Sequence, residues 1–380
     1  MSDVPPLPPV ESEDVSREAK QAESRVFPCD GCGADFEFAI DVQRLECPFC
    51  GHVKALEIAE DARVEEQDLR DALDEQATRR SSGSQAMSDV KQVACVDCGA
   101  QVQFHGTLTS KECPYCATPI QLEGIHDAED RIKVDGVLPF QVERSKAQSN
   151  LKLWVQSRWF APNEFKQRGA QGRFSGVYMP YWTYDALTMN DYVGERGEHY
   201  YVSVRRGDKT VQERRTRWYP ASGSFRRFFD DVLVAAGRGL SSKRVRSLEP
   251  WPLDRCLPFN QQVLAGYLAR TYDVPLRAGL EQAEQRIGAA IYSDVCSRIG
   301  GDVQRVHSIQ TEYGALTYKH LLLPVWLMAY KYGKKRFQVL VNAATGEVQG
   351  ERPYSWIKIL LFVVSMVAIV VVIVAIAANL

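Results

Sequence analysis

The 380-residue sequence lacks the short motifs that usually mark a catalytic centre. It contains no Gly-x-x-x-x-Gly-Lys-Ser/Thr phosphate loop, no closely spaced group of histidines and no Gly-x-Ser-x-Gly nucleophile elbow. Two isolated cysteines, Cys256 and Cys296, have no histidine near them in the sequence, so we expect packed thiols and not nucleophiles. These absences give an enzyme no positive support, and we predict a non-enzymatic protein.

Basic residues are scarce in the N-terminal part of the chain. Residues 1–136 carry 28 acidic and 13 basic side chains, whereas the remainder carries 20 acidic and 33 basic ones. Affinity for nucleic acid comes largely from Lys and Arg that neutralise phosphates, so an acidic N-terminal half argues against binding there. The C-terminal excess includes a basic cluster, which we interpret as a solvated surface or as a surface for anionic headgroups: Arg205, Arg206, Arg214, Arg215, Arg217, Arg226, Arg227, Lys243, Arg244 and Arg246.

Eight of the ten cysteines form two copies of one pattern. Each copy has two Cys-x-x-Cys pairs, and the spacer between the pairs has the same length in both, from Gly33 to Glu46 and from Gly99 to Glu112. A two-residue spacer within a pair lets both thiolates face one tetrahedral ion, so we predict two metal sites. Their ligands are Cys29, Cys32, Cys47 and Cys50 in the first site and Cys95, Cys98, Cys113 and Cys116 in the second.

Structural zinc, one ion per site, is the favoured occupant. Four cysteines leave no open position for a substrate, and about 30 residues bury too little apolar surface to fold without a metal. Iron in a rubredoxin-like site suits the same sulfur ligands, and dithiol redox chemistry is a third interpretation. Gly33, Gly51 and Gly99 each follow a second cysteine, where a sharp bend favours glycine, whereas Ala117 departs from this rule.

The segment from Ile359 to Ala378 carries no charge and is rich in Ile and Val. As a helix, twenty residues extend about 30 Å, the thickness of the hydrocarbon core. We predict one transmembrane helix over residues 357–378, followed only by Asn379 and Leu380, and therefore a tail anchor. Lys334, Lys335, Arg336, Arg352 and Lys358 precede this span, so the positive-inside tendency keeps the N-terminal bulk in the cytoplasm.

The expected fold class is α+β, in six parts. A Pro-rich and acidic tail (1–25) precedes the first zinc ribbon (26–56), an acidic helical linker (57–92) and the second zinc ribbon (93–123). An α+β domain (137–353) and the transmembrane helix (357–378) follow. The reducing cytoplasm agrees with cysteine ligands.

Periodicity predicts the elements of the α+β domain. We expect helices over 145–159, over 225–236 and over 275–300. Strands are expected over 303–313 and 321–332, with a hairpin over 337–348. Four residues, Trp182, Tyr184, Asp185 and Trp326, are interpreted as core in preference to a ligand pocket.

The domain shows two pairs of similar segments that suggest an internal duplication. Leu138-Pro139-Phe140 is matched by Leu257-Pro258-Phe259, at an offset of 119 residues. Met179-Pro180-Tyr181-Trp182 is matched by Leu323-Pro324-Val325-Trp326, at an offset of 144 residues. Because the offsets differ, chance similarity is the alternative interpretation.

Taken together, three features resemble bacterial membrane-anchored double zinc-ribbon proteins of the YdjG type. They are the Cys-Pro-Phe-Cys-Gly and Cys-Pro-Tyr-Cys pairs, the segment Met-Pro-Tyr-Trp-Thr-Tyr-Asp-Ala, and the hairpin Val-Asn-Ala-Ala-Thr-Gly-Glu-Val before a terminal span. Such proteins are often labelled TFIIB-type zinc ribbon or primosomal protein N′ (replication factor Y) helicase-like. The absence of a phosphate loop gives the helicase label no support.

The resemblance implies a non-enzymatic adaptor of envelope stress at the cytoplasmic face of the bacterial inner membrane. It further implies cytoplasmic partners of the phage-shock or SPFH/virion-core-like kind, with lipid contacted through the C-terminal helix. The alternative is a membrane-tethered nucleic-acid-binding protein, which the basic residues of 137–353 favour.

Overall fold

The computed structural model describes residues 27–56, 62–82, 91–94, 101–104, 110–112, 119–121, 126–127, 132–163, 165, 173–237, 242–332 and 335–378. All structural statements below refer to these residues.

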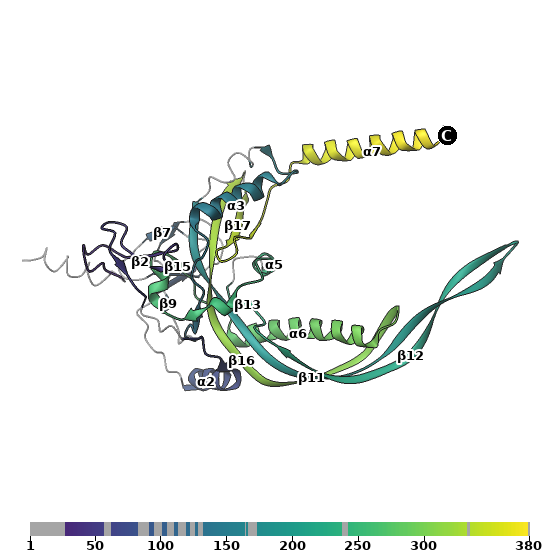
Figure 1. Cartoon of the computed structure of the whole chain (residues 1–380), viewed down its shortest axis with the longest axis horizontal. Coiled ribbons are helices and arrows are strands. Elements are labelled where there is room, and N and C mark those ends of the chain that lie inside the picture. Colours follow the sequence, from purple (N-terminus) through teal and green to yellow (C-terminus); the bar gives the residue numbers. More distant parts are fainter. Residues whose placement is uncertain are drawn as a thin grey trace, which may run out of the picture.

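Three long strands form the centre of the main sheet, and they curve into an extended arm (Figure 1). They are β11 (Arg173–Arg206), β12 (Lys209–Phe229) and β16 (Val303–Tyr332). β11 pairs antiparallel with β12 on one side and with β16 on the other. Alternating β-branched and aromatic residues favour this extended backbone, because such side chains pack well on a pleated sheet.

Short strands complete the sheet, whose central order is β12-β11-β16-β10-β14. β10 runs parallel to β16, and β15 runs parallel to β11. β17 pairs with β16, and β18 with β17. The short strands are β4 (Gln67–Asp68), β10 (Gly136–Val137), β13 (Val234–Ala235), β14 (Leu257–Pro258), β15 (Leu268–Ala269), β17 (Lys335–Asn342) and β18 (Val348–Gly350).

Helix α6 (Leu276–Ile299) lies along the concave side of the long strands (Figure 1). It buries one side chain per turn against the sheet, from Leu276 to Ile299. Gly279 permits the closest approach, because a Cβ there would lie 2.4 Å from the Tyr184 hydroxyl. The Tyr184 hydroxyl donates to the Leu276 carbonyl (2.7 Å), and Trp182 Nε1 donates to the Val274 carbonyl (2.8 Å). These bonds satisfy buried polar groups where the helix begins. The predicted helix over 275–300 is confirmed.

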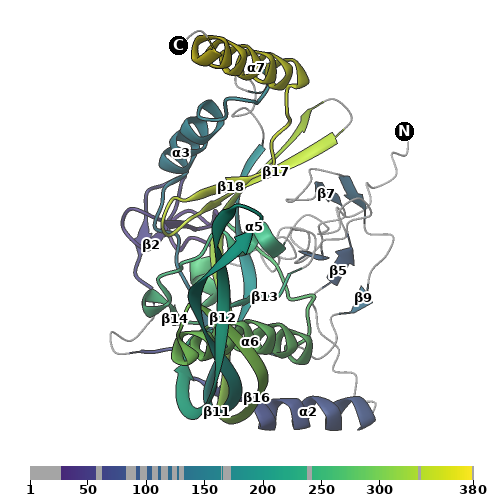
Figure 2. The same ribbon diagram turned by 90° about the vertical axis from the view of Figure 1, so that its right-hand side faces the viewer.

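At the other end of the domain, α3 (Arg144–Gln156) and the β17–β18 hairpin lie beside the start of α7 (Trp356–Ala378), as Figures 1 and 2 show. α3 buries Ala147, Leu151 and Val155, which recur every four residues and form its apolar face. The predicted helix near 145–159 and the hairpin near 337–348 are confirmed. Three short helices, α5 (Ser242–Arg246), η1 (Leu253–Arg255) and η2 (Gln261–Leu264), connect the remaining strands.

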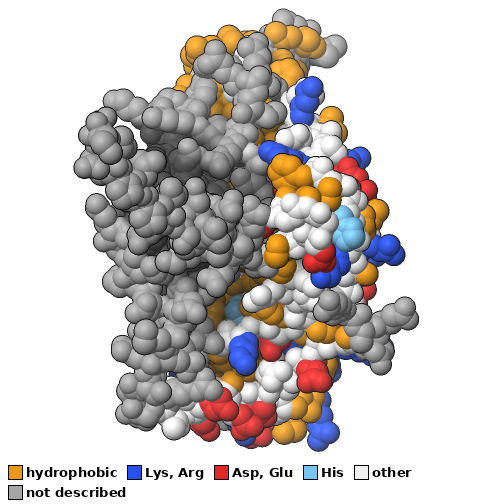
Figure 3. All heavy atoms as spheres, turned by 90° about the vertical axis from the view of Figure 1, so that its left-hand side faces the viewer, with side chains coloured by type: hydrophobic (Ala, Val, Ile, Leu, Met, Phe, Trp, Pro, Cys, Tyr) orange, Lys and Arg blue, Asp and Glu red, His pale blue; other side chains and the backbone are white. Residues whose placement is uncertain are grey.

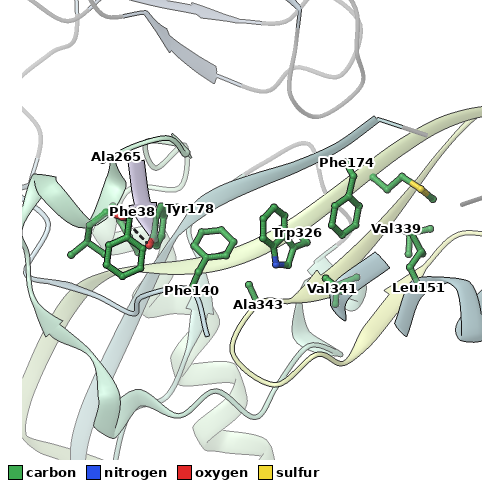
Figure 4. Packing of buried hydrophobic residues seen from close by; sticks show 14 of the residues in the cluster. Phe38, Phe140, Leu151, Phe174, Tyr178, Ala265, Trp326, Val339, Val341 and Ala343 are labelled. Carbon is green, nitrogen blue, oxygen red and sulfur yellow. Dashed lines mark hydrogen bonds between the residues drawn. The ribbon is translucent and has the colours of Figure 1, made fainter. Parts of the chain in front are cut away.

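The first cysteine module, residues 27–56, packs directly on the α+β domain. It contains β1 (Glu37–Ala39), β2 (Arg44–Glu46) and β3 (Val53–Lys54), paired in that order. Phe38 is 2% exposed and shares a core with Phe140, Tyr178 and Ala265 (Figure 4). The Phe38 backbone NH also donates to the Ala265 carbonyl (3.0 Å). The module and the domain therefore have one continuous core.

The second cysteine module, residues 91–127, repeats part of this architecture. Its strands are β5 (Lys91–Ala94), β6 (Gln101–Phe104), β7 (Ser110–Glu112), β8 (Pro119–Gln121) and β9 (His126–Asp127). β2 pairs with β3 through Leu45↔Lys54, and β7 pairs with β8 through Lys111↔Ile120. The interval from Leu45 to Lys111 equals the interval from Lys54 to Ile120, and both equal the interval from Cys29 to Cys95. The sequence repeat is therefore also a repeat of strand register.

The segment between the modules is helical over a shorter range than the linker prediction. Residues 62–66 have no regular secondary structure, β4 pairs with β16, and α2 (Leu69–Ser82) begins only at Leu69. The Asp68 carboxylate accepts from the backbone NH groups of Arg70 (2.8 Å) and Asp71 (3.1 Å), which fixes the helix start. Leu69 is buried beside Tyr318, so the linker is attached to the sheet.

The predicted helix over 225–236 is wrong, because Phe225 and Phe229 belong to strand β12. Residues i and i+4 lie on one face in a strand as well as in a helix, so the spacing of these phenylalanines suits both. Phe228 is 58% exposed, which agrees with the two-residue alternation of a strand. The two strands predicted over 303–332 form a single strand, β16, whose pairing with β11 shifts in register between Asp185 and Leu187 and again between Val193 and Gly194.

We predict that Phe38→Ala destabilises the protein by about 3 to 5 kcal/mol, because a buried aromatic ring is lost between the module and the domain. Chemical denaturation of the detergent-solubilised full chain measures this change. Phe49→Ala is the matched control, since Phe49 lies in the same module and is 80% exposed. Equal effects of both substitutions would contradict a shared core.

Candidate metal centre

The four cysteines of the first module converge. The sulfurs of Cys29, Cys32, Cys47 and Cys50 all lie within 4.8 Å of one another. The Cys29 and Cys50 sulfurs are 3.5 Å apart, as are those of Cys32 and Cys47. A tetrahedral zinc ion with bonds of about 2.3 Å requires sulfurs about 3.8 Å apart. The cluster thus has nearly the spacing that one ion needs.

Local backbone geometry positions each cysteine pair. Gly33 and Gly51, which follow the second cysteine of each pair, have φ of 72° and 70°, as the sequence pattern predicts. The Gly33 NH donates to the Cys29 carbonyl (2.8 Å), and the Gly51 NH donates to the Cys47 carbonyl (2.9 Å). These two turns have the same form, and they direct all four sulfurs to one point.

The pKa values of Cys47 and Cys50 in this cluster differ. Burial raises the pKa of the Cys47 thiol, but backbone NH groups of Cys50 and Phe49 outweigh it and lower the pKa to about 7. The backbone NH of His52 lowers the pKa of Cys50, but the neighbouring thiols of Cys32 and Cys29 outweigh it and raise the pKa to about 12. A divalent cation removes this conflict, because it stabilises all four sulfurs as thiolates.

The donor set fits a structural metal ion. Four sulfurs saturate a tetrahedral ion, and the Gly31 NH, 3.4 Å from the Cys29 sulfur, adds a hydrogen bond to a ligand. Cys29 and Cys47 are buried, whereas Cys32 and Cys50 are exposed, so the cluster lies at the module surface. Zinc is compatible with this group.

The second predicted site, Cys95, Cys98, Cys113 and Cys116, lies outside the described residues, as do Gly99 and Ala117. The flanking strands are described, and β7 and β8 have the register of β2 and β3. Each of these hairpins joins the strand before a Cys-x-x-Cys pair to the strand after it.

The other candidate residues are packed. Trp182, Tyr184, Asp185 and Trp326 are each at most 4% exposed, which agrees with the core interpretation. Burial raises the pKa of the Cys256 thiol to about 12, which makes it a poor nucleophile. Cys296 is half-buried on α6.

Sequence reasoning did not find the partly buried ionic network around Asp185. Three carboxylates, Asp185, Asp230 and Asp231, come together on the sheet. Lys319 lies among them, with its ammonium 2.9 Å from Asp231 Oδ1 and 3.7 Å from Asp185 Oδ2. The Thr317 hydroxyl also donates to Asp185 (3.0 Å). Lys319 thereby supplies the positive charge that a metal ion would bring, and we assign the network to the core.

Comparison with known proteins finds a distant relative. The uncharacterized protein YdjG of Bacillus subtilis (strain 168) is 24% identical over 221 residues, which make up 58% of this chain and 63% of the relative. The aligned region therefore spans less than two thirds of that protein. No protein-family description matches the chain, and no solved structure does.

We predict that Cys47→Ala removes one metal ion per chain, because three sulfurs no longer close the tetrahedron. Elemental analysis of the purified full chain measures the metal and distinguishes zinc from iron. Cys256→Ala is the control and should retain the full metal content. An unchanged metal content in Cys47→Ala would rule out this cluster as a metal site.

We predict that Lys319→Met destabilises the protein by about 3 kcal/mol, because it leaves the buried Asp185 carboxylate without a cation. Lys319→Arg keeps the charge and should cost less. Lys209→Met, at the exposed first residue of β12, should change stability by less than about 0.5 kcal/mol. Thermal unfolding of the full chain checks the order of the three variants. A loss in Lys319→Met no larger than in Lys209→Met would contradict the assignment.

Proposed function

We propose that this protein is a non-enzymatic membrane-anchored adaptor that recruits cytoplasmic proteins through its cysteine modules and the acidic linker between them. The observation that carries the proposal is the exposed acidic face of α2, which lies between two cysteine modules on a domain joined to an apolar helix. The resemblance of the sequence motifs to membrane-anchored zinc-ribbon proteins of the YdjG type implies such a role.

α7 is the proposed anchor. Its window Trp356–Val374 has a mean hydropathy of 3.2, and none of it is buried against the rest of the described chain. An apolar helix that the rest of the described chain leaves largely exposed needs another apolar environment, and a bilayer provides one. The basic residues before the span favour a cytoplasmic position for the bulk of the chain, and in a bacterial cell the membrane would be the inner one.

The acidic linker supports recruitment. Asp71, Asp74 and Glu75 are exposed on α2, on the side away from the buried Leu69. Acidic side chains gather near the lower edge of the face in Figure 3, at the height of α2 in Figure 1. Such a surface favours a partner with a basic patch. Phage-shock or SPFH/virion-core-like proteins are the partners we propose.

Each cysteine module would hold one structural zinc ion, two per chain. A metal in the first module would stabilise the fold from Phe27 to Leu56 and keep Phe38 seated against the domain. It would have no catalytic role, because four sulfur ligands leave no position for a substrate.

We further infer that the α+β domain is internally duplicated. β11 and β16 pair symmetrically about Met179↔Leu323, so that Pro180 faces Leu322 and Tyr178 faces Pro324. A two-fold rotation at this point carries β11 onto β16 with the offset that relates the sequence match of 179–182 to 323–326. The same rotation carries the parallel pairing of β10 with β16 onto that of β15 with β11.

The sequence match between 138–140 and 257–259 is not part of this duplication. The rotation relates Gly136–Val137 to Leu268–Ala269, because these two short strands hold equivalent places beside β16 and β11. β14 (Leu257–Pro258), which pairs with β10, is therefore not the equivalent of β10. The repeated unit is then a short strand, a helix (α3 or α6), a long strand and its hairpin partner.

A second candidate function is nucleic-acid binding, favoured by the outer part of the β11–β12 hairpin. β16 reaches only Gly197, so residues 198–217 extend as two strands beyond it. They carry Arg205, Arg206, Arg214, Arg215 and Arg217. Two-stranded basic ribbons enter nucleic-acid grooves in other proteins.

We predict that Asp74→Lys with Glu75→Lys reduces recovery of the cytoplasmic partners at least tenfold, because the substitutions reverse the charge of α2. Affinity purification from solubilised membranes, followed by mass spectrometry, measures recovery. Glu281→Lys with Glu284→Lys makes the same charge change on α6 and should leave recovery unchanged.

Nuclease treatment separates the two candidate functions. Recovery of proteins should survive it if the modules bind protein. Partners lost after nuclease, together with salt-sensitive binding of nucleic acid that requires Arg205 and Arg206, would favour the second candidate.

A further inference from the structure

A cavity of about 950 Å³ lies between the end of α3 and strand β18, close to the first turn of α7. Its lining includes Trp154, Arg158, Arg352 and Tyr354. Figures 1 and 2 both show α3, β18 and the start of α7 at the same end of the molecule. The cavity is therefore at the end of the domain that faces the proposed membrane.

Chain connectivity fixes the distance of this cavity from the span. α7 begins at Trp356, two residues after Tyr354 and four after Arg352. An extended chain advances at most about 3.5 Å per residue. The Cα atom of Tyr354 therefore lies within about 7 Å of the helix start, and that of Arg352 lies within about 14 Å. The headgroup layer on each side of the hydrocarbon core is about 5 to 8 Å thick. With Trp356 at the edge of the hydrocarbon core, the backbone of Tyr354 lies within the thickness of the headgroup layer.

Among the residues that the structure describes, two guanidinium groups of the lining have no acidic partner. Arg158 lies over the Trp154 ring (4.7 Å to its centre) and donates to the Trp154 carbonyl (3.3 Å), while Arg352 lies over the Tyr354 ring (5.3 Å). Within the described chain, neither forms an ion pair with a carboxylate. Burial and the positive charge of Arg352 both lower the pKa of Arg158. An anion between the two arginines would relieve this repulsion.

The acidic residues of the lining do not cancel this charge. Glu351 pairs with Arg244, so its carboxylate is already neutralised. Glu347 is exposed, and its carboxylate accepts from Gln349 (2.9 Å). With Arg158 and Arg352 both charged, the cavity has one net positive charge left over.

Aromatic side chains around the cavity complete a membrane-facing rim. Trp159 is 72% exposed and Trp356 is 81% exposed, although both are large and apolar. Phe160 packs edge to face on Phe362 (5.4 Å), six residues into α7. At 1.5 Å per residue this contact is about 9 Å along the helix, so the loop after α3 reaches the level of the acyl chains. Tryptophan and tyrosine favour this interfacial depth.

A further contact holds this loop against the start of α7. The Lys358 ammonium donates to the Ala161 carbonyl (2.8 Å) and to Asn163 Oδ1 (2.7 Å). Segments far apart in the sequence thereby meet at the membrane surface.

We propose that this cavity binds the phosphate headgroup of an anionic phospholipid, with Arg158 and Arg352 contacting the phosphate and Trp154 and Tyr354 lining its path. Planar guanidinium groups bind phosphate oxygens through paired, charge-assisted hydrogen bonds. The inference rests on α7 being the membrane span of the proposed adaptor.

The test measures lipid retained by the full-length chain. The chain is purified in an uncharged detergent, mixed with phosphatidylglycerol or phosphatidylcholine, and analysed by native mass spectrometry. We expect retention of phosphatidylglycerol over phosphatidylcholine, and at least a tenfold weaker affinity for it in Arg158→Gln with Arg352→Gln. Arg70→Gln with Arg277→Gln is the matched control, because both arginines are exposed on α2 and α6, at the opposite end of the domain from α7.

Several outcomes would overturn the proposal. Equal retention of both lipids by the unmodified chain would overturn it. This comparison needs no variant, so it remains decisive even if the double variant does not fold. Equal loss in the control pair would show a general charge effect. Glycerol 3-phosphate that competes as well as phosphatidylglycerol would make the cavity a site for a soluble anion. Partner recovery in the α2 variants is measured in a separate experiment. Loss of the lipid proposal therefore leaves the adaptor proposal intact, and loss of partner recruitment leaves the lipid proposal intact.

Discussion

The pairing of β11 with β16 is the constraint on which the rest of the structure depends. These strands lie side by side for most of their lengths, and each side of the pair receives further elements. β10, β17 and β4 attach to β16, while β12, β13 and β15 attach to β11. A shift of one residue in this register would move every inward side chain to the opposite face. The positions of Trp182 and Tyr184 beneath α6 follow from the same register.

The same pairing connects the first cysteine module and α2 to the end of the domain at which α7 begins. The first module packs beside Phe140 and Tyr178, and α2 packs beside Tyr318 on β16. At the other end, Trp326 on β16 donates to the Val142 carbonyl (2.8 Å), just before α3 begins. The cysteine module, the acidic helix and the base of α7 are therefore attached to one sheet. A rigid connection of this kind is what an adaptor needs to hold a partner at a defined place near a surface.

Sequence reasoning succeeded where a local pattern has a single structural solution. The cysteine spacing identified the first cluster, and the uncharged run identified α7, because neither pattern suits an ordinary core. Reasoning failed where two structures share a pattern, as for Phe225 and Phe229, whose spacing suits a helix and a strand equally. It also missed Lys319 beside Asp185, since these residues are far apart in the sequence and meet only because β11 and β16 pair. Contacts between residues on paired strands cannot be predicted until the register of the pairing is known.

The charge distribution gives the two ends of this sheet different preferences. At one end, α2 presents Asp71, Asp74 and Glu75 to solvent, and phosphate groups of a membrane would repel them. At the other end, Arg158 and Arg352 lack acidic partners in the described chain and lie close to the start of α7. If α7 spans a membrane as proposed, electrostatics would favour the same orientation as the hydrophobic helix, with the basic end toward lipid and the acidic end away from it. Two independent forces that favour one orientation would leave the acidic face of α2 accessible to the proposed partner, even with the domain close to the bilayer.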